Sequence, residues 1–243
     1  MSTKDKFDEL MERYDKDQDL CGVISSGKNV YPLGSDTKVL STIFELFSRP
    51  LVKHFADKYG YEVIEPDKQN HYPDFTLQRN ACDRAKIAID VKTTYVIAPT
   101  DRFSYTLGGY TSFIRNNTKN IVFPFNHYSE HWVLGYVYTR SALKKSATHK
   151  VYKLDEIDEI PRPYQDVEWF FQEKWRIAGD KAGSGNTTNI GSIYGCLEDF
   201  QAGNGPFRSE DEFLDYWRHY ERTAEERARK FSHVEGYRQW LKS

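Results

Sequence analysis

The chain has 243 residues, of which 39% are hydrophobic and 15% aromatic, so it can bury a full core. This size fits one large domain, or one domain with a small accessory lobe. No apolar run approaches a membrane span, no signal peptide is expected at the N-terminus, and three scattered cysteines favour a reducing cytoplasm over a zinc ribbon. The net charge of −2 excludes a uniformly basic nucleic-acid binder and leaves only localised basic patches for such a partner.

The first half of the chain opens with two helical patterns and continues with strands. Residues 3–16 read as a short amphipathic helix. A longer helix is predicted from Asp36 to Tyr59, capped by Asp36 or the serine before it and ended by Gly60. Pro50 is expected to kink or split this helix. Strands are predicted at 61–65, 73–79, 85–95, 103–113 and 132–139.

The second half of the chain is expected to end in helices. Two strand patterns, near 150–154 and 166–178, precede a polar, glycine-rich loop that spans 178–191. Ser209 and Ser232 each begin a pattern that predicts a capped helix. Because the strands are grouped between helices and do not alternate with them, the sequence predicts an α+β fold with a mixed sheet.

The most informative pattern pairs two acids with a lysine on neighbouring strands. Asp90 and Lys92 lie at the end of an apolar strand pattern, two residues apart, and therefore point to one face. Asp74 opens the preceding strand pattern. Two carboxylates and a lysine in this arrangement can bind a hard divalent cation and orient a water molecule, as nucleases require. Glu45, inside the long helix, could add a third carboxylate.

Simpler readings stay open for each of these patterns. Acid-x-lysine triplets occur by chance, so Asp90 and Lys92 could belong to an ordinary solvated strand face. Glu45 could point to solvent, as most acids on a helix do. The glycine-rich loop is either a surface connector or a segment whose backbone approaches a ligand closely, with asparagines that can read adenine in a major groove.

Longer runs of sequence resemble one family, the EcoRV-like type II restriction endonucleases of the PD-(D/E)xK superfamily. The matching runs are 31–50, 69–77, 86–95, 106–122, 135–140, 182–193 and 209–223. The chain departs from the family pattern at Lys68, at Val91 and over 78–85, 96–104, 194–205 and 224–243. The resemblance implies a restriction-endonuclease-like α+β fold, in which helices flank a central mixed sheet and a small lobe serves dimerisation.

The resemblance also implies a division of the single domain 1–243 and a role for each matching residue. Residues 19–32 and 150–160 would form the dimerisation lobe, 35–140 the catalytic core, and 166–243 the recognition loop and DNA-binding helices. Catalysis would rest on Asp74, Asp90, Lys92 and Glu45, with the three acids as metal ligands. The implied DNA contacts are Gly183, Gly185, Asn186 and Thr187 in the recognition loop, Asn70 at the minor groove, and Thr37, Thr93, Thr94, Ser112, Lys119 and Asn189 near phosphates.

The function implied by the resemblance is site-specific cleavage of double-stranded DNA. A homodimer using Mg²⁺, or Mn²⁺ in its place, would cut the palindrome GATATC bluntly and leave 5′-phosphate ends. Such an enzyme would work in a bacterial cytoplasm, with no membrane partner, beside a DNA methyltransferase of the same specificity. Two alternatives remain at this point, a repair or junction nuclease of the same fold and a non-catalytic DNA-binding protein.

Overall fold

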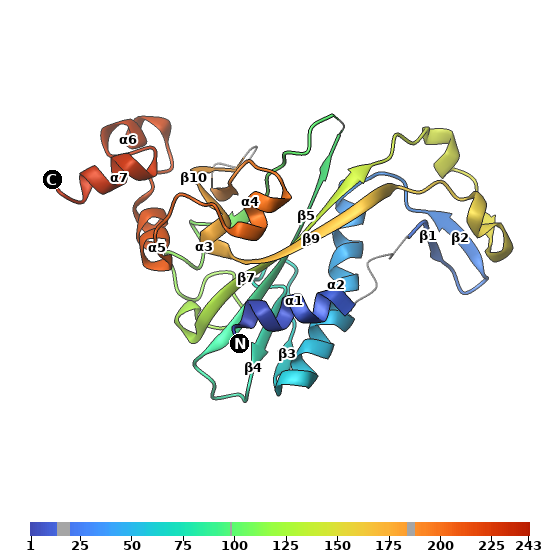
Figure 1. Cartoon of the computed structure of the whole chain (residues 1–243), viewed down its shortest axis with the longest axis horizontal. Helices are drawn as coiled ribbons and strands as arrows, with labels where there is room; N and C mark the ends of the chain where they lie inside the picture. The colour runs from blue at the N-terminus through green and yellow to red at the C-terminus, as the bar shows by residue number, and fades with distance from the viewer. Residues whose placement is uncertain (14–19, 98, 184–187) are drawn as a thin grey trace.

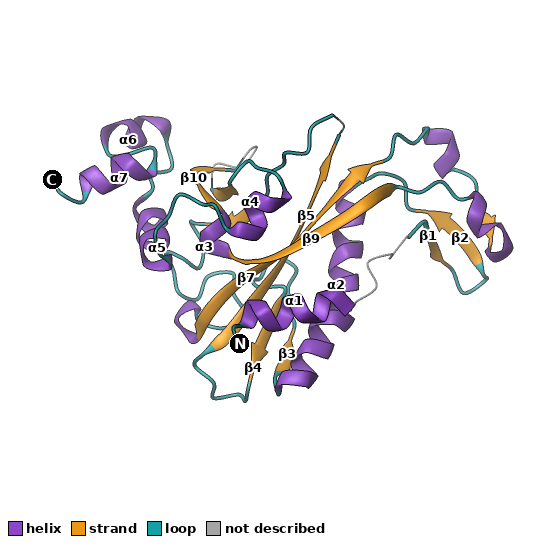
Figure 2. Cartoon of the chain, in the orientation of Figure 1, coloured by secondary structure: helices purple, strands orange, loops and turns teal. Residues whose placement is uncertain are grey.

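A five-stranded mixed sheet forms the centre of the protein (Figure 1). The computed structural model describes residues 1–13, 20–97, 99–183 and 188–243. The strands stand in the order β3 (Glu62–Ile64), β4 (Phe75–Gln78), β5 (Lys86–Val96), β7 (Tyr128–Arg140) and β9 (Tyr164–Glu173). Only the β5–β7 pair of this sheet is parallel, and the other neighbours are antiparallel. The predicted mixed sheet between helices is therefore confirmed (Figure 2).

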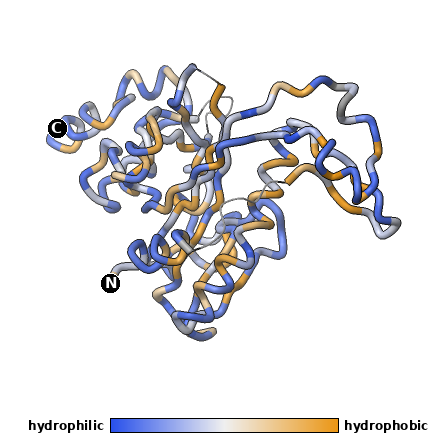
Figure 3. The backbone as a smooth tube through the Cα atoms, turned by 45° about the vertical axis from the view of Figure 1, so that its right-hand side comes forward, coloured by the Kyte–Doolittle hydropathy of each residue, from blue (hydrophilic) through white to orange (hydrophobic). Residues whose placement is uncertain are grey.

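One face of the sheet packs against α1 (Thr3–Arg13) and α2 (Thr37–Tyr59). Ile87, Ile89 and Val91 of β5 belong to the core on this face, whereas Ala88 belongs to the core on the other face. Hydrophobic residues recur along the central strands and α2 (Figure 3). Because side chains alternate along a strand, Asp90 and Lys92 share the face of Ala88 and point away from α2.

The long helix α2 is capped as its sequence predicts. The side chain of Asp36 accepts hydrogen bonds from the backbone N–H groups of Lys38 and Val39. Gly60 ends the helix with a φ of 73°, a left-handed conformation that suits glycine. The predicted split at Pro50 is wrong, because residues on both sides of the proline belong to one helix. Leu40, Phe44, Leu51, Val52 and Phe55 are all buried, so packing holds the helix together across the missing hydrogen bond.

The opposite face carries a second, three-stranded sheet in the order β10 (Ala178–Ala182), β11 (Asn189–Ser192) and β6 (Thr106–Gly109). This corrects three predictions. The strand expected at 103–113 is shorter, the glycine-rich segment is flanked by two strands, and the strand expected at 166–178 ends at Glu173. There the chain turns into the short helix α3 (Lys174–Ile177). Pairing of β6 with β11 brings two distant polar segments side by side.

The C-terminal region contains α4 (Leu197–Ala202), α5 (Glu210–His219), α6 (Ala224–Arg229) and α7 (Val234–Trp240). Ser209 caps α5 as predicted by accepting a hydrogen bond from the backbone of Glu212. The cap of α7 is His233, and not the predicted Ser232, because the imidazole accepts a hydrogen bond from the N–H of Gly236. Buried aromatic side chains of α5 and α7 join the core on this face of the sheet.

A small sheet lies at the other end of the molecule from the C-terminal helices (Figure 1). It consists of β1 (Gly22–Ile24), β2 (Asn29–Pro32) and β8 (Tyr152–Lys153), with the 3₁₀ helix η3 (Leu154–Glu159) beside it. Two other short 3₁₀ helices are η1 (Phe125–His127) and η2 (Lys145–Thr148). Among the described residues, no helix is both long enough and apolar enough to pass through a lipid bilayer.

Candidate active site

Asp74 and Asp90 meet because two neighbouring strands place them side by side. In the register of β4 and β5, Phe75 lies opposite Ile89, so Asp74 sits just ahead of β4 and next to Asp90. The backbone N–H of Val91 donates a hydrogen bond of 2.6 Å to Oδ2 of Asp74. The side chain of Val91 packs into the core on the other face. Because Asp74 contacts the backbone of Val91, the departure from the family pattern at this residue leaves the contact in place.

Lys92 completes the group. Its Nζ lies 2.9 Å from Oδ1 of Asp90 and donates a hydrogen bond of 3.0 Å to the backbone carbonyl of Val91. The Lys92 side chain is 23% exposed, against 7% for Asp90, so Lys92 is the more accessible of the two side chains. Burial lowers the pKa of Lys92, but the nearby carboxylates of Asp90 and Asp74 outweigh burial and raise it. Lys92 therefore keeps its positive charge at neutral pH.

The two acids differ in their electrostatic surroundings. Burial, opposed by Lys92 and reinforced by the charge of Asp90, raises the pKa of Asp74 to about 7. Burial also acts on Asp90, but the ammonium groups of Lys92 and Lys174 outweigh it and hold the pKa of Asp90 below its ordinary value. The site thus contains one firmly ionised carboxylate and a second that titrates near neutral pH.

These residues line a hollow of about 360 Å³. Seven of the residues predicted from the sequence share it: Asn70, Asp74, Asp90, Lys92, Ser112, Lys119 and Asn189. The others in its wall include Gln69, His71, Gly108, Gly109 and Thr188. Glycine backbones, amides and hydroxyls beside a lysine and two acids are groups that contact phosphates and base edges. The hollow therefore has the chemistry of a nuclease site.

Comparison with known proteins supports this interpretation. A family model described as "Restriction endonuclease EcoRV" matches residues 13–242. The type II restriction enzyme EcoRV of Escherichia coli is 60% identical over 230 residues, which are 94% of each chain. The chain belongs to the EcoRV family of restriction endonucleases. It is therefore a type II restriction enzyme, which hydrolyses phosphodiester bonds of DNA.

Among solved structures, the NlaIV restriction endonuclease aligns with a TM-score of 0.39 and 14% identity, covering 100% of this chain and 91% of that one. This TM-score is too low to define a shared fold. The assignment to the EcoRV family rests on the sequence matches.

Some residues that were expected to contact DNA do not line the hollow that contains Asp74, Asp90 and Lys92. Thr37 is exposed at the start of α2, and Thr93 and Thr94 are half-buried further along β5. Gly183 donates its N–H to the carbonyl of Asn189 at 2.8 Å, at the end of the β10–β11 hairpin. Gly185, Asn186 and Thr187 lie outside the described residues.

Glu45 stands apart from the two other acids. It is half-buried on α2 and is not part of the wall of the hollow, although its charge acts on both Asp74 and Lys92. Across the described part of the chain, no three acidic, histidine or cysteine side chains form a cluster able to hold a metal ion. The site as it stands therefore offers two carboxylates, with Glu45 as a more distant negative charge.

One charged residue of this site had no signal in the sequence. Lys174, the first residue of α3, is 3% exposed, and its Nζ lies 3.4 Å from Oδ2 of Asp90. The ring of Tyr72 lies 4.0 Å from the same ammonium, and the Tyr72 hydroxyl is 2.9 Å from Nδ1 of His131. Burial lowers the pKa of Lys174 to about 8, against the opposing effect of Asp90.

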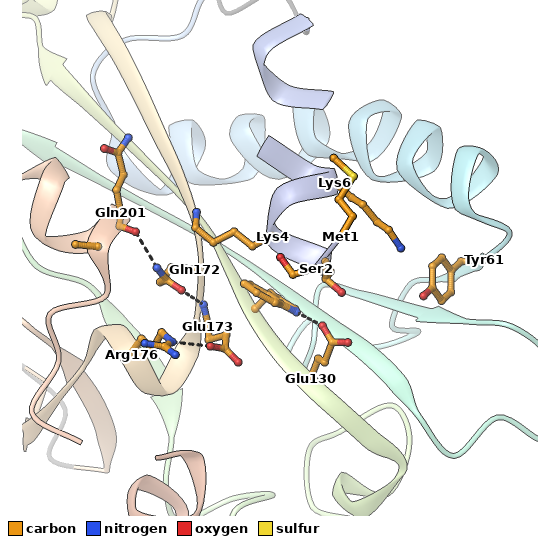
Figure 4. A pocket seen from close by; sticks show the side chains of 13 residues that line it. Met1, Ser2, Lys4, Lys6, Tyr61, Glu130, Gln172, Glu173, Arg176 and Gln201 are labelled. Carbon is orange, nitrogen blue, oxygen red and sulfur yellow. Dashed lines mark hydrogen bonds and ion pairs between the residues drawn. The ribbon is translucent and has the colours of Figure 1, made fainter. Parts of the chain in front are cut away.

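A larger hollow of about 660 Å³ lies elsewhere, at the N-terminus of α1 (Figure 4). None of the predicted site residues lines it. Several of its polar side chains bind one another: Arg176 pairs with Glu173 at 2.7 Å, and Trp132 donates to Glu130 at 2.7 Å. The larger hollow therefore contains none of the residues predicted for the nuclease site.

Proposed function

We propose that the chain is a Mg²⁺-dependent enzyme that cuts double-stranded DNA at GATATC. The observation that carries the proposal is the group formed by Asp74, Asp90 and Lys92 in a hollow rimmed by Asn70, Lys119 and other polar residues. The matching family supports the same chemistry.

The residues present suit a hard divalent cation. Asp74 and Asp90 offer carboxylate oxygens, which Mg²⁺ prefers and which Mn²⁺ also accepts. Mg²⁺ commonly uses one or two carboxylates and completes its shell with water and substrate phosphate, so a third nearby acid is not required. Burial is the main cause that raises the pKa of Asp74, and the charge of Asp90 adds to it, so a cation bound between the two acids would offset both effects. When bound, the ion would neutralise charge on the phosphate and lower the pKa of water.

The remaining roles fall to side chains of this chain. Lys92 is exposed enough to reach a bound phosphate and is held by Asp90, so it can orient the attacking water and stabilise negative charge on the phosphorus oxygens. The water oxygen bonds to phosphorus as the bond from phosphorus to the 3′ oxygen breaks. The 3′ oxygen takes up a proton, which leaves a 5′-phosphate and a 3′-hydroxyl.

We assign recognition to the polar segments that the family resemblance predicts. The loop from Gly183 to Thr187 would read bases in the major groove, and Asn70, exposed at the rim, would face the minor groove. Ser112, Lys119 and Asn189 would contact phosphates beside the catalytic group, and Thr37, Thr93 and Thr94 would do so further out. Bending of the flexible central TA step would add indirect readout.

A palindrome is best read by a two-fold dimer, and the small sheet supplies a suitable surface. Six large hydrophobic side chains of this lobe are exposed: Val23, Ile24, Tyr31, Val151, Leu154 and Ile157. Val23 and Ile24 are 54% and 57% exposed, which is unusual for apolar residues clustered on one lobe. We assign this surface, within 20–32 and 150–160, to the homodimer interface.

The proposal also implies a cellular setting. An enzyme that cuts GATATC would also cut the DNA of its own cell, so a methyltransferase of the same specificity must protect that DNA. Both proteins would act in a bacterial cytoplasm.

Cleavage rates on defined duplexes test the proposal. The cleavage rates on a duplex with one GATATC site and on matched duplexes with one base pair changed should differ by roughly 5-fold to 150-fold, since a mismatched pair costs about 1–3 kcal/mol. Similar rates on all duplexes would favour a repair or junction nuclease. Binding without cleavage would favour a non-catalytic protein.

A further inference from the structure

Lys174, which comes from a distant part of the chain, forms an ion pair with Asp90, the proposed metal ligand. Asp90 is on β5, and Lys174 follows the end of β9, with β7 between the two strands. Each oxygen of Asp90 faces its own ammonium group. Oδ1 is 2.9 Å from Nζ of Lys92, and Oδ2 is 3.4 Å from Nζ of Lys174.

The two lysines differ in what they can reach. The Lys92 side chain is 23% exposed and lines the hollow, whereas the Lys174 side chain is 3% exposed and is not among the residues of its wall. Lys174 therefore cannot touch a bound phosphate in this arrangement. Any effect of Lys174 on catalysis must pass through Asp90.

The surroundings of Lys174 hold its ammonium in place. The Tyr72 ring lies 4.0 Å from Nζ and the Phe113 ring 5.7 Å from it, so the cation rests against aromatic faces. Tyr72 is itself fixed by the contact of 2.9 Å between its hydroxyl and the buried His131. Among the described residues, Nζ of Lys174 has no hydrogen-bond partner, so its ion pair with Asp90 is its main polar contact.

Among the described residues, Lys174 forms its ion pair with Asp90, and this pairing points to a role beyond packing in the core. An unpaired charge in such a place is strongly unfavourable, and uncharged residues of similar size would fill the space without it. We propose that Lys174 is a positioning residue, which holds Oδ2 of Asp90 and thereby fixes the direction in which Asp90 presents its carboxylate to a divalent cation. This inference rests on the proposed role of Asp90 as a metal ligand.

Lys86 provides a matched control in the same sheet. It is 1% exposed, lies on β5 as Asp90 does, and its ammonium rests 4.6 Å from the ring of Phe123. Its Nζ donates to the backbone carbonyl of Asp83 at 2.5 Å and does not contact the acids of the site. Loss of either buried lysine should destabilise the fold, but only Lys174 should affect Asp90.

The test compares Lys174→Met, Lys174→Gln and Lys86→Met with the wild-type chain. Two properties are measured on folded protein: the affinity of the DNA complex for Mn²⁺, by electron paramagnetic resonance, and the single-turnover cleavage rate at saturating Mg²⁺. Partners that orient metal ligands typically contribute about 10–100-fold, so Lys174→Met should lower both properties by that factor. Lys174→Gln keeps an N–H donor and should lose less, and it also serves if the methionine variant does not fold.

Three results would overturn the proposal. The first is a folded Lys174 variant with wild-type Mn²⁺ affinity and rate. The second is tighter Mn²⁺ binding at an unchanged rate, because Lys174 would then only add positive charge. The third is an equal loss in Lys86→Met, because the effect would then come from removal of any buried lysine. Failure of the proposed function is distinguishable, since it would appear as absence of cleavage by the wild-type chain, whereas Mn²⁺ affinity would still test Lys174.

Discussion

The backbone N–H of Val91 donates a hydrogen bond to Oδ2 of Asp74 at 2.6 Å, and this bond links the strand that carries Asp90 to the side chain of Asp74. It holds Asp74 beside Asp90 in a largely buried place, where the two negative charges repel. The pKa of Asp74 is raised to about 7 in consequence of burial, with a further contribution from Asp90. The pH dependence of the metal-free protein should report this arrangement.

We predict that Asp74 makes the metal-free protein less stable as pH rises from about 4 to about 7. In this range the folded chain holds a proton that the unfolded chain has released. The free energy of unfolding is therefore highest below the pKa of Asp74 in the unfolded chain, and it decreases as pH rises through the pKa in the folded chain. Urea unfolding across this range should show the decline in the wild-type chain and a flatter profile in Asp74→Asn. Equal slopes would contradict the prediction.

Asp90→Ala should abolish cleavage and also destabilise the fold. From the sequence alone the site is a cluster of acids, and removal of one charge would leave stability intact. In the structure, Asp90 is instead the shared partner of Lys92 and Lys174, so its loss leaves the buried ammonium of Lys174 without its ion pair. Removal of one partner of a buried pair costs about 3 kcal/mol or more. Urea unfolding should show this loss, and Lys174→Met added to Asp90→Ala should recover part of it.

Lys119→Ala should weaken DNA binding without changing sequence preference. Lys119 lines the hollow together with Asp74, Asp90 and Lys92, and we propose that it contacts a phosphate and not a base edge. Each lost phosphate contact lowers the slope of log K against log salt concentration by about 1. Lys53→Ala is the control, because Lys53 lies exposed on α2 and pairs with Asp57. A slope that does not change in Lys119→Ala, or changes equally in both variants, would argue against the phosphate contact.

Ile157→Asp should weaken the proposed dimer. Ile157 is 39% exposed on η3, which packs against β2 and β8 of the small sheet. A carboxylate buried in an apolar interface should raise the dissociation constant by at least about tenfold. Analytical ultracentrifugation without DNA measures this constant. Leu241→Asp, which changes an exposed apolar residue at the far end of the molecule, should leave it unchanged. Dimerisation unaffected by Ile157→Asp would move the interface elsewhere.

The parts of the fold that were predicted correctly depend on local signals. The caps of α2 and the apolar run before Asp90 act within a few residues, so they can be read directly from the chain. The strands β10 and β11 were missed because their glycines and polar residues have low strand propensity, and pairing with β6 supplies what propensity does not. The helix is not split at Pro50, because burial of the surrounding helix face outweighs the local effect of the proline.

In the candidate site, too, local patterns could be predicted from the sequence, whereas contacts between distant segments could not. Asp74, Asp90 and Lys92 are close in sequence and share a face by strand alternation, so their meeting could be predicted. Lys174 could not be found this way, because its place depends on β9 pairing with β7 and on β7 pairing with β5. Tyr72 and His131, which complete its surroundings, are likewise brought together by the fold.

The most direct test of the account is digestion of a plasmid that contains one GATATC sequence, with Mg²⁺ and separately with EDTA, followed by sequencing of the ends. We expect one blunt cut at the centre of that sequence, with 5′-phosphate ends, and no cut in EDTA. Cleavage in EDTA would contradict the metal-dependent role of Asp74 and Asp90. Cuts at other sequences would contradict the assigned specificity.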